Sequence, residues 1–242
     1  MVTIIYSIAF VIACYLLGSL PQMHLIARAR GIDPDREPDL HAALWQKAGR
    51  PIGFSAIFID VLKGAIPIIV GFSLRLPLAT VALGAVAAIC GQMWPLFAKF
   101  DGEKGNTPAI GATLTLTLYL TFTTAPLAYI VLLAFAIPII IGVAIKLAPL
   151  FAAPDQTWSQ RLMFGGPASD SLPVGNLIAF AATPVASQCL GFPLQMTLPL
   201  ALIFLVIVVR RLTAGLRADL QTAGISTGRI LLNRFLYDRS YR

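Results

Sequence analysis

Long apolar runs separated by short polar connections dominate the chain. A helix needs roughly 20 residues to cross a hydrocarbon core of about 30 Å, and seven runs approach or exceed that length. The runs cover residues 2–20, 51–74, 77–98, 106–122, 125–145, 173–191 and 196–209. This pattern predicts an all-α polytopic membrane protein with seven transmembrane helices, in which small residues such as Gly84 and Gly111 let helix backbones approach closely.

The basic residues predict how these helices are oriented. If each run crosses once, the connections after the first, third, fifth and seventh runs share one side of the membrane. Of the 18 lysines and arginines, Lys63 lies inside a run and Arg75 lies on the opposite side, whereas all the others fall on the shared side. Because positive charge gathers on the cytoplasmic side, we expect an external N-terminus and a cytoplasmic C-terminus.

The composition agrees with this topology and narrows the range of partners. The chain is 57% hydrophobic and 12% charged, against about 25% charged in a typical soluble domain. The net charge of +7 follows from the basic side and from contact with anionic lipid, so we expect no nucleic-acid partner. We predict a transmembrane domain over 1–209 and a basic cytoplasmic tail over 210–242. The tail forms an amphipathic helix on the membrane surface or packs over the loops as a lid.

One turn carries the clearest chemical signal. A lysine stands between glycines where the chain leaves the third apolar run, and the segment reads Gly102, Glu103, Lys104, Gly105, Asn106, Thr107. Glycines allow a close backbone approach, exposed N–H groups can face an anion, and the ammonium adds a full charge. The glycines, Lys104, Asn106 and Thr107 are therefore candidate phosphate-binding residues. Alternatively, the segment is only a tight connection in which Thr107 caps the next helix.

Asp60 and Lys63 form a polar pair inside the second run. Residues three apart share a helix face, and charges at membrane depth pair with one another or line a wet cavity. The pair is thus either a structural ion pair or part of a polar site. His24 and His41 have no third candidate ligand nearby in the sequence, so we expect no metal site.

The first cytoplasmic connection offers further cations. Residues 33–39 mix both charge signs with prolines, which is typical of a solvated loop. Residues 40–50 have apolar positions at helical spacing, with Lys47 and Arg50 beside them. Such a helix either anchors at the interface through Trp45 or contributes these two cations to a phosphate site.

Three motifs resemble those of a known family. Residues 91–105, which read GQMWPLFAKFDGEKG, resemble the second signature of the bacterial acyl-phosphate:glycerol-3-phosphate acyltransferases. That signature has Gly-His, an aromatic residue, Pro, Phe and then Phe-Lys-Gly-Gly-Lys-Gly. Residues 60–64 (DVLKG) resemble the family's Asp-x-x-Lys-Gly, and residues 18–21 (GSLP) its Gly-Ser-Ile-Pro. The likeness covers nearly the whole chain and is strongest over 16–107.

The resemblance implies an integral enzyme of the bacterial inner membrane whose site faces the cytoplasm. Its substrates would be acyl-phosphate and glycerol 3-phosphate, and its products lysophosphatidate and inorganic phosphate. It implies no cofactor, since neither coenzyme A nor a carrier protein is the direct donor. The positions that match the signature make Gln92 and Lys104 the candidate catalytic residues.

The chain also departs from the family's signatures. Gln92 stands at the histidine of the second signature, and Glu103 at its second glycine before the lysine. Gln92 can form hydrogen bonds but cannot exchange a proton near neutral pH as imidazole can. Acid–base work assigned to position 92 would therefore be lost.

The first signature, Ser-Gly-Asn-x-Gly-Ala-Thr-Asn followed by an arginine, is essentially absent. Arg36, Glu37 and Pro38 stand at its Ser-Gly-Asn, and Gln46 at its arginine. Lys47 or Arg50 could replace that arginine from one turn away. The family has a last signature after the final span, and only its basic residues have counterparts in this chain. These counterparts are Arg210, Arg211 and Arg217.

Four functions are compatible with these features. The first is an active, divergent acyltransferase, and the second is a catalytically degenerate relative that binds a phospholipid precursor or a protein partner. The others are a transferase of different specificity on the same scaffold and a small membrane transporter. A transporter would be expected to carry further acids at the midplane, where Asp60 is the available acid.

Overall fold

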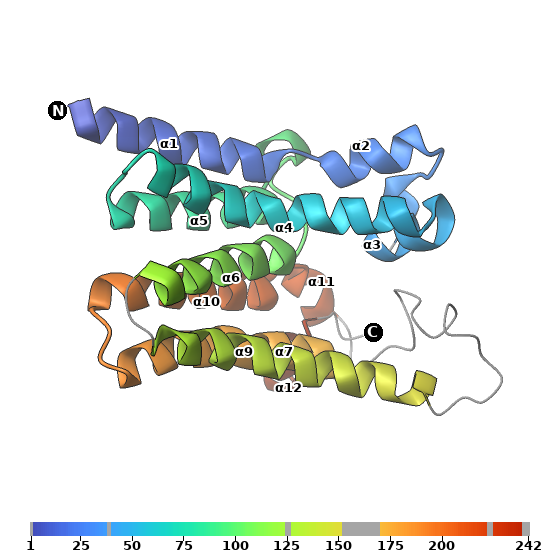
Figure 1. Ribbon diagram of the computed structural model, residues 1–242. Helices are drawn as coiled ribbons and strands as arrows, with labels where there is room; N and C mark the ends of the chain where they lie inside the picture. The colour runs from blue at the N-terminus through green and yellow to red at the C-terminus, as the bar shows by residue number, and fades with distance from the viewer. Residues whose placement is uncertain (1, 38–39, 124–126, 152–169, 222–224, 239–242) are drawn as a thin grey trace.

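The computed structural model describes residues 2–37, 40–123, 127–151, 170–221 and 225–238, and all regular structure in these ranges is helical (Figure 1). Pro38, Arg161, Arg239 and Arg242, which enter the sequence analysis, lie outside the described residues. The elements are α1 (Val2–Ser19), α2 (Gln22–Ala29), η1 (Pro34–Arg36), α3 (Leu40–Ala43), η2 (Leu44–Ala48), α4 (Arg50–Ser73), α5 (Leu78–Met93), η3 (Leu96–Ala98), α6 (Asn106–Thr123), α7 (Ala128–Phe151), α9 (Ser171–Cys189), α10 (Leu194–Thr213), α11 (Leu216–Leu220) and α12 (Thr227–Tyr237).

Each of the seven predicted runs contains a helix, and five helical segments are long and apolar enough to cross a membrane. These are Ile4–Ala29, Arg50–Ser73, Leu78–Ala98, Ala128–Ala148 and Leu194–Thr213. Helices α6 and α9 are not among the five, since they contain many glycine, serine and threonine residues of low hydropathy. The last run proves longer than predicted, because the helix continues through Arg210 and Arg211 to Thr213.

Glycines bring two pairs of helices into close contact. A side-chain carbon added at Gly64 of α4 would lie 1.8 Å from the carbonyl oxygen of Pro108 in α6, and one at Gly111 would lie 2.0 Å from that of Val61. Gly18 makes the same kind of approach between α1 and α5. Gly111 thus lets two helix backbones approach closely, as predicted. Gly84 instead faces a side chain, the ring of Phe10. These crossings are possible only because the glycines lack a side chain.

The helices form layers around an apolar core (Figure 1). Helix α1 packs on α5, α4 on α6, and α7 on α9, with α10 between α5 and α9. Phe135 and Phe180 meet in the core with ring centroids 5.6 Å apart. Large apolar side chains such as Phe122, which is 83% exposed, also cover the outer surface. An exposed apolar belt of this kind suits contact with lipid.

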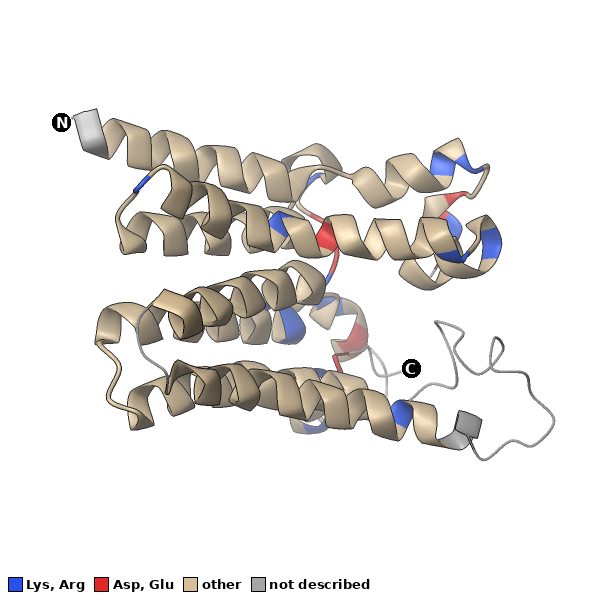
Figure 2. Ribbon diagram, in the orientation of Figure 1, with Lys and Arg blue, Asp and Glu red and all other residues tan. Residues whose placement is uncertain are grey.

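Charged residues are distributed unevenly along the helices. Figure 2 shows them gathered toward one end of the bundle, while the opposite end is uncharged apart from the α4–α5 turn, which contains Arg75. After α10 the tail folds back, and α12 packs on α9 and α10. Within it the Arg234 guanidinium pairs with the Asp219 carboxylate at 2.6 Å, both being buried. The described part of the tail therefore packs against the protein.

Candidate active site

A cavity of about 610 Å³, with both polar and apolar residues in its wall, lies between the ends of several helices. Its wall is formed by the α1–α2 junction, α3, α4, α5, the turn between α5 and α6, the start of α9 and the residue after α12. The predicted site residues in this wall are Lys63, Gln92, Gly102, Lys104, Gly105, Asn106 and Thr107. One concavity therefore brings together most of the residues singled out in the sequence.

Backbone geometry explains the glycines of the turn. Gly105 has φ +71°, a left-handed conformation that side chains disfavour. A side-chain carbon at Gly102 would lie 2.2 Å from the carbonyl oxygen of Gln92. The Glu103 N–H donates to that same oxygen at 3.1 Å. The turn is thus folded tightly against the end of α5.

Arg210 holds the turn from the other side. Its guanidinium donates to the carbonyl oxygens of Gly102 and of Glu103, the latter at 3.2 Å. It also lies 5.8 Å from the centre of the Trp94 ring and 3.8 Å from the Asp101 carboxylate. The planar fork of arginine suits this double contact, so α10 fixes the shape of the turn.

Lys104 and Asn106 already bind an anionic group. The Asn106 amide donates to the Asp238 carboxylate at 2.7 Å, and the Lys104 ammonium lies 3.8 Å from the same oxygen, Oδ2. The ammonium also donates to the Asp238 carbonyl oxygen. Lys104 is 58% exposed, whereas Asp238 is buried. The turn therefore places one amide donor and one ammonium beside a single carboxylate at the edge of the cavity.

Asp60 is the centre of a buried hydrogen-bond network. It is fully buried, and its Oδ2 accepts from Gln92 Nε2 at 2.9 Å and lies 3.1 Å from His41 Nε2. Its Oδ1 accepts from Gln22 and lies 3.4 Å from the Lys63 ammonium. Four side chains from different parts of the chain thus compensate one buried carboxylate.

Lys63 connects the Asp60 network to the cavity. Its ammonium donates to the carbonyl oxygens of Leu20 at 2.8 Å and Gly18 at 3.3 Å, both at the end of α1. It also reaches the amide oxygen of Gln92 at 3.5 Å. The Asp60–Lys63 pair is therefore an ion pair that joins helices and, through Lys63, also lines the cavity.

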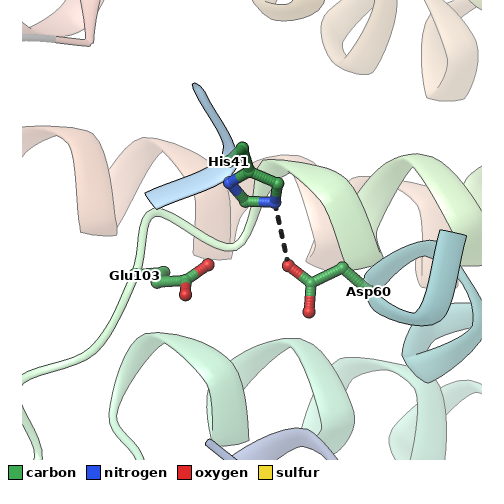
Figure 3. A group of neighbouring side chains, drawn as sticks. All are labelled: His41, Asp60 and Glu103. Carbon is green, nitrogen blue, oxygen red and sulfur yellow. Dashed lines mark hydrogen bonds and ion pairs between the residues drawn. The ribbon is translucent and has the colours of Figure 1, made fainter. Parts of the chain in front are cut away.

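Glu103 adds a second carboxylate to this network (Figure 3). Gln92 Nε2 donates to Glu103 Oε2 at 2.9 Å as well as to Asp60, and the two carboxylates face each other beneath the His41 ring. Burial raises the pKa of the Glu103 carboxyl, and the negative charge of Asp60 raises it further.

His41, Asp60 and Glu103 are residue types that can ligate metals, and their ligand atoms lie within 4.8 Å of one another. In the fold, His41 therefore has two further candidate ligands beside it, although none lies near it in the sequence. However, the Lys63 ammonium and the Gln92 amide already contact these carboxylates. We therefore interpret the group as a hydrogen-bonded charge network.

Two predicted cations lie outside the described cavity wall. Lys47 pairs with Glu37, and it is Glu37 that lines the cavity. Arg50 begins α4 and is likewise not part of the wall. The predicted helix over 40–50 is in fact a short α3, a π-helical η2 and a break at Gly49, which has φ 100°.

His41, Asn176 and Asp238 are among the wall residues that were not predicted as site residues from the sequence. Asn176 is 7% exposed, and its amide oxygen makes no hydrogen bond within the described part of the chain. These residues were not predicted because they lie far from the glycine turn in the sequence. Asp238, for example, is 132 residues from Asn106. Their side chains, an imidazole, an amide and a carboxylate, suit a polar site, but no local spacing in the sequence connected them to the turn.

The fold and the cavity together define the class: a polytopic helical membrane protein with a carboxylate-binding turn and a buried charge network between helix ends. A protein-family model of glycerol-3-phosphate acyltransferase matches residues 8–217. The chain therefore belongs to the glycerol-3-phosphate acyltransferase family.

Curated relatives agree with this assignment over part of their length. The chain is 37% identical over 122 residues to a glycerol-3-phosphate acyltransferase of Blochmanniella pennsylvanica, covering 48% of this chain and 62% of that protein. It is 35% identical over 108 residues to that of Geotalea daltonii, covering 43% and 56%, respectively. The chain thus matches little more than half the length of these relatives.

Two solved structures share the fold. The crystal structure of PlsY (YgiH), an integral membrane glycerol 3-phosphate acyltransferase, in its glycerol 3-phosphate form gives a TM-score of 0.61 at 19% identity. Its lysophosphatidic acid form gives 0.59 at 20% identity. Both alignments cover 98% of this chain and 95% of PlsY. The likeness extends across the whole fold, including the two helices that are less apolar than the others.

Proposed function

We propose that the protein transfers an acyl group from acyl-phosphate to the 1-hydroxyl of glycerol 3-phosphate, forming lysophosphatidate and inorganic phosphate. The observation that carries this proposal is the pair of donors, Lys104 and Asn106, that holds the Asp238 carboxylate at the cavity edge. A phosphate has the same charge sign and more acceptor oxygens, so it can take the place of this carboxylate. Family membership supports the same activity.

The cavity suits a reaction between two phosphorylated substrates. Lys63 and Lys104 line it, and Gly102, Gly105 and Thr107 supply backbone close to the lysine. Holding both substrates in one place lowers the entropic barrier to acyl transfer. Donors near the acyl carbonyl would stabilise the oxyanion that develops on it.

We also propose that all seven helices cross the bacterial inner membrane, with the N-terminus outside and the cavity facing the cytoplasm. Helices α6 and α9 pack against candidate spans on two sides, α6 on α4 and α7, and α9 on α7 and α10. A helix enclosed in this way can cross the membrane with a modest hydropathy of its own.

The topology can be tested at Cys189, which is exposed at the end of α9. The proposed orientation places this thiol outside, so a membrane-impermeant maleimide should label it in intact cells of a Gram-negative host with a permeabilised outer membrane. The Cys189→Ser variant is the control. Labelling that requires lysis of the inner membrane would contradict the proposed orientation.

The activity can be tested with purified protein in lipid, acyl-phosphate and glycerol 3-phosphate. Phosphate release should depend on glycerol 3-phosphate, and Lys104→Ala should lower kcat/KM by about 10- to 100-fold, the worth of one charge-assisted hydrogen bond. Lys99→Ala is the matched control, because Lys99 precedes the turn and lies outside the described cavity wall.

Absence of any release above the Lys104→Ala background would favour a second function, binding of a phospholipid precursor without turnover. One observation favours that alternative. An amide, Gln92, occupies the position where the resembled signature has an imidazole, and its hydrogen bonds go to Asp60 and Glu103. Equilibrium binding of glycerol 3-phosphate without product would identify this case.

A further inference from the structure

Departures from the family's signatures meet at one point in the structure. Gln92 stands in place of a histidine and Glu103 in place of a glycine, and one amide nitrogen of Gln92 joins Glu103 to Asp60. His41 belongs to the segment in which the first signature is absent. The structure brings it to the same Asp60 oxygen, at 3.1 Å.

The chain therefore places an imidazole beside Asp60 from another element than the one that carries position 92. Asp60 Oδ2 contacts the Gln92 amide from α5 and the His41 ring from α3. His41 lines the cavity, and its side chain is 20% exposed, whereas Asp60 lies behind it fully buried. An imidazole can exchange protons near neutral pH, and an amide cannot.

We propose that His41 is a catalytic residue of the acyl transfer, oriented by Asp60, and that it performs the proton transfer that an amide at position 92 cannot perform. This inference rests on the proposed function. Asp60 is the orienting partner because its carboxylate accepts a hydrogen bond from the ring Nε2–H, which fixes the ring and stabilises the imidazolium that forms.

The step is balanced in atoms and charge. The 1-hydroxyl oxygen of glycerol 3-phosphate forms a bond to the acyl carbonyl carbon while its proton passes to the His41 imidazole. The bond from that carbon to the phosphate oxygen breaks, and the phosphate leaves with the electron pair. The imidazolium then returns its proton to the released phosphate, which restores the neutral ring.

The groups around His41 suit a transient positive charge. Among the described residues, Asp60 on α4 and Glu103 on the turn are two acids beside it (Figure 3). Lys63 pairs with the other oxygen of Asp60, away from the ring. The preceding segment contributes Glu37, which is paired with Lys47, and α2 contributes His24 to the same wall.

The first test is the His41→Gln variant, because glutamine can still donate to Asp60 but cannot titrate. We expect kcat to fall about 100-fold, within the range of general acid–base catalysis. The pH profile of kcat should lose an ionisation that the wild-type enzyme shows. His24→Gln is the matched control at the other histidine, and it should keep that ionisation in the profile.

The second test places the imidazole at its alternative position. In the double variant His41→Gln with Gln92→His, a ring again contacts Asp60, so kcat should recover to within about tenfold of wild type, and the ionisation should return. A purely structural role of His41 would not be rescued in this way. Elution in detergent and the unfolding temperature check that each variant is folded.

The possible results distinguish a failure of the proposed acyltransferase activity from a failure of the proposed role of His41. A wild-type protein that releases no phosphate above Lys104→Ala overturns the proposed function, and with it the role of His41. An active wild type together with an unchanged rate and pH profile in His41→Gln overturns the role of His41 alone. Loss of rate with the ionisation retained, or without rescue by Gln92→His, also overturns it.

Discussion

Glu103 illustrates how one residue changes the electrostatics of the whole site. The turn would close with a glycine at this position, but here a carboxyl group is packed beside Asp60 and shares a single amide donor with it. Burial raises the pKa of Glu103 above its ordinary value, and the charge of Asp60 adds to the shift. The folded protein therefore holds this proton more tightly than the unfolded chain does.

The Glu103→Gln variant should become more stable relative to wild type as the pH rises. The stabilisation from protonated Glu103 is fully present below the unfolded pKa of about 4.3 and is lost as the pH rises through the raised folded value. A glutamine at position 103 does not ionise, so the variant does not lose stability in this way. Thermal unfolding in detergent at a series of pH values measures the difference.

Asp101→Asn is the control for that experiment, because Asp101 is 95% exposed two residues earlier on the same segment. Its unfolding curves measure the effect of replacing an exposed carboxylate on this segment by an amide, against which the Glu103→Gln curves are compared. Parallel curves for wild type and Glu103→Gln would show that Glu103 ionises as freely in the folded protein as in the unfolded chain.

The sequence predicted those residues of the candidate site that local spacing connects. Lys104 and Asn106 follow from the glycine turn, and Lys63 follows from a charge inside an apolar run. His41 and Asp238 could not be found in this way, because tertiary packing alone brings them to the cavity. Lys47 and Arg50 were favoured for their closeness in sequence, and the described wall does not include them.

Among the elements, the α4–α6 crossing is the least tolerant of added volume. Gly64 to Ala would place a carbon 1.8 Å from a backbone oxygen of α6, and backbone cannot move aside as a flexible side chain can. We expect the variant to lose at least about 1 to 3 kcal/mol of stability. The unfolding temperature in detergent reports this loss.

Gly228→Ala serves as the matched control, since a carbon added there meets no atom within 4 Å. Its effect should stay within about 0.5 kcal/mol, as for other surface substitutions. Equal unfolding temperatures for the Gly64 and Gly228 variants would mean that α4 and α6 are not in close contact in the membrane.

A second contact between elements joins the end of α10 to the turn that contains Gly102 and Lys104. Arg210→Lys keeps the charge but cannot reach two carbonyl oxygens with one planar group, so the turn should loosen. We expect kcat/KM to fall about tenfold, the worth of one charge-assisted hydrogen bond. Arg217→Lys, at an exposed position in α11, is the control and should leave kcat/KM unchanged. Equal kcat/KM values for the Arg210→Lys and Arg217→Lys variants would mean that Arg210 contributes only its charge.

Helix positions were predictable because apolar runs of spanning length have few other solutions in a membrane. The segment between α2 and α4 was not predictable in detail. Apolar residues at helical spacing indicated one helix, but the chain forms a π-helical turn and then breaks at Gly49. The end of α10 was missed because Arg210 and Arg211 resemble tail residues until their buried carbonyl partners are known.

If the glycine turn binds the substrate phosphate as proposed, the tail and that phosphate compete for the same two donors, Lys104 and Asn106. In Asp238→Asn the competing charge is removed, so KM for a phosphorylated substrate should fall about two- to fivefold, the size of one partly exposed ion pair. The exposed Asp35→Asn is the control. An unchanged or higher KM for Asp238→Asn would mean that the tail supports binding instead of opposing it.

The position of Asp238 also gives this contact a use as a sensor. If a phosphate takes the two donors, as proposed, the Asp238 carboxylate loses its contacts to the turn. An environment-sensitive fluorophore attached at position 237, next to this carboxylate, should then change its emission as ligand is titrated. Occupancy could thus be followed optically, without turnover and without labelling the ligand.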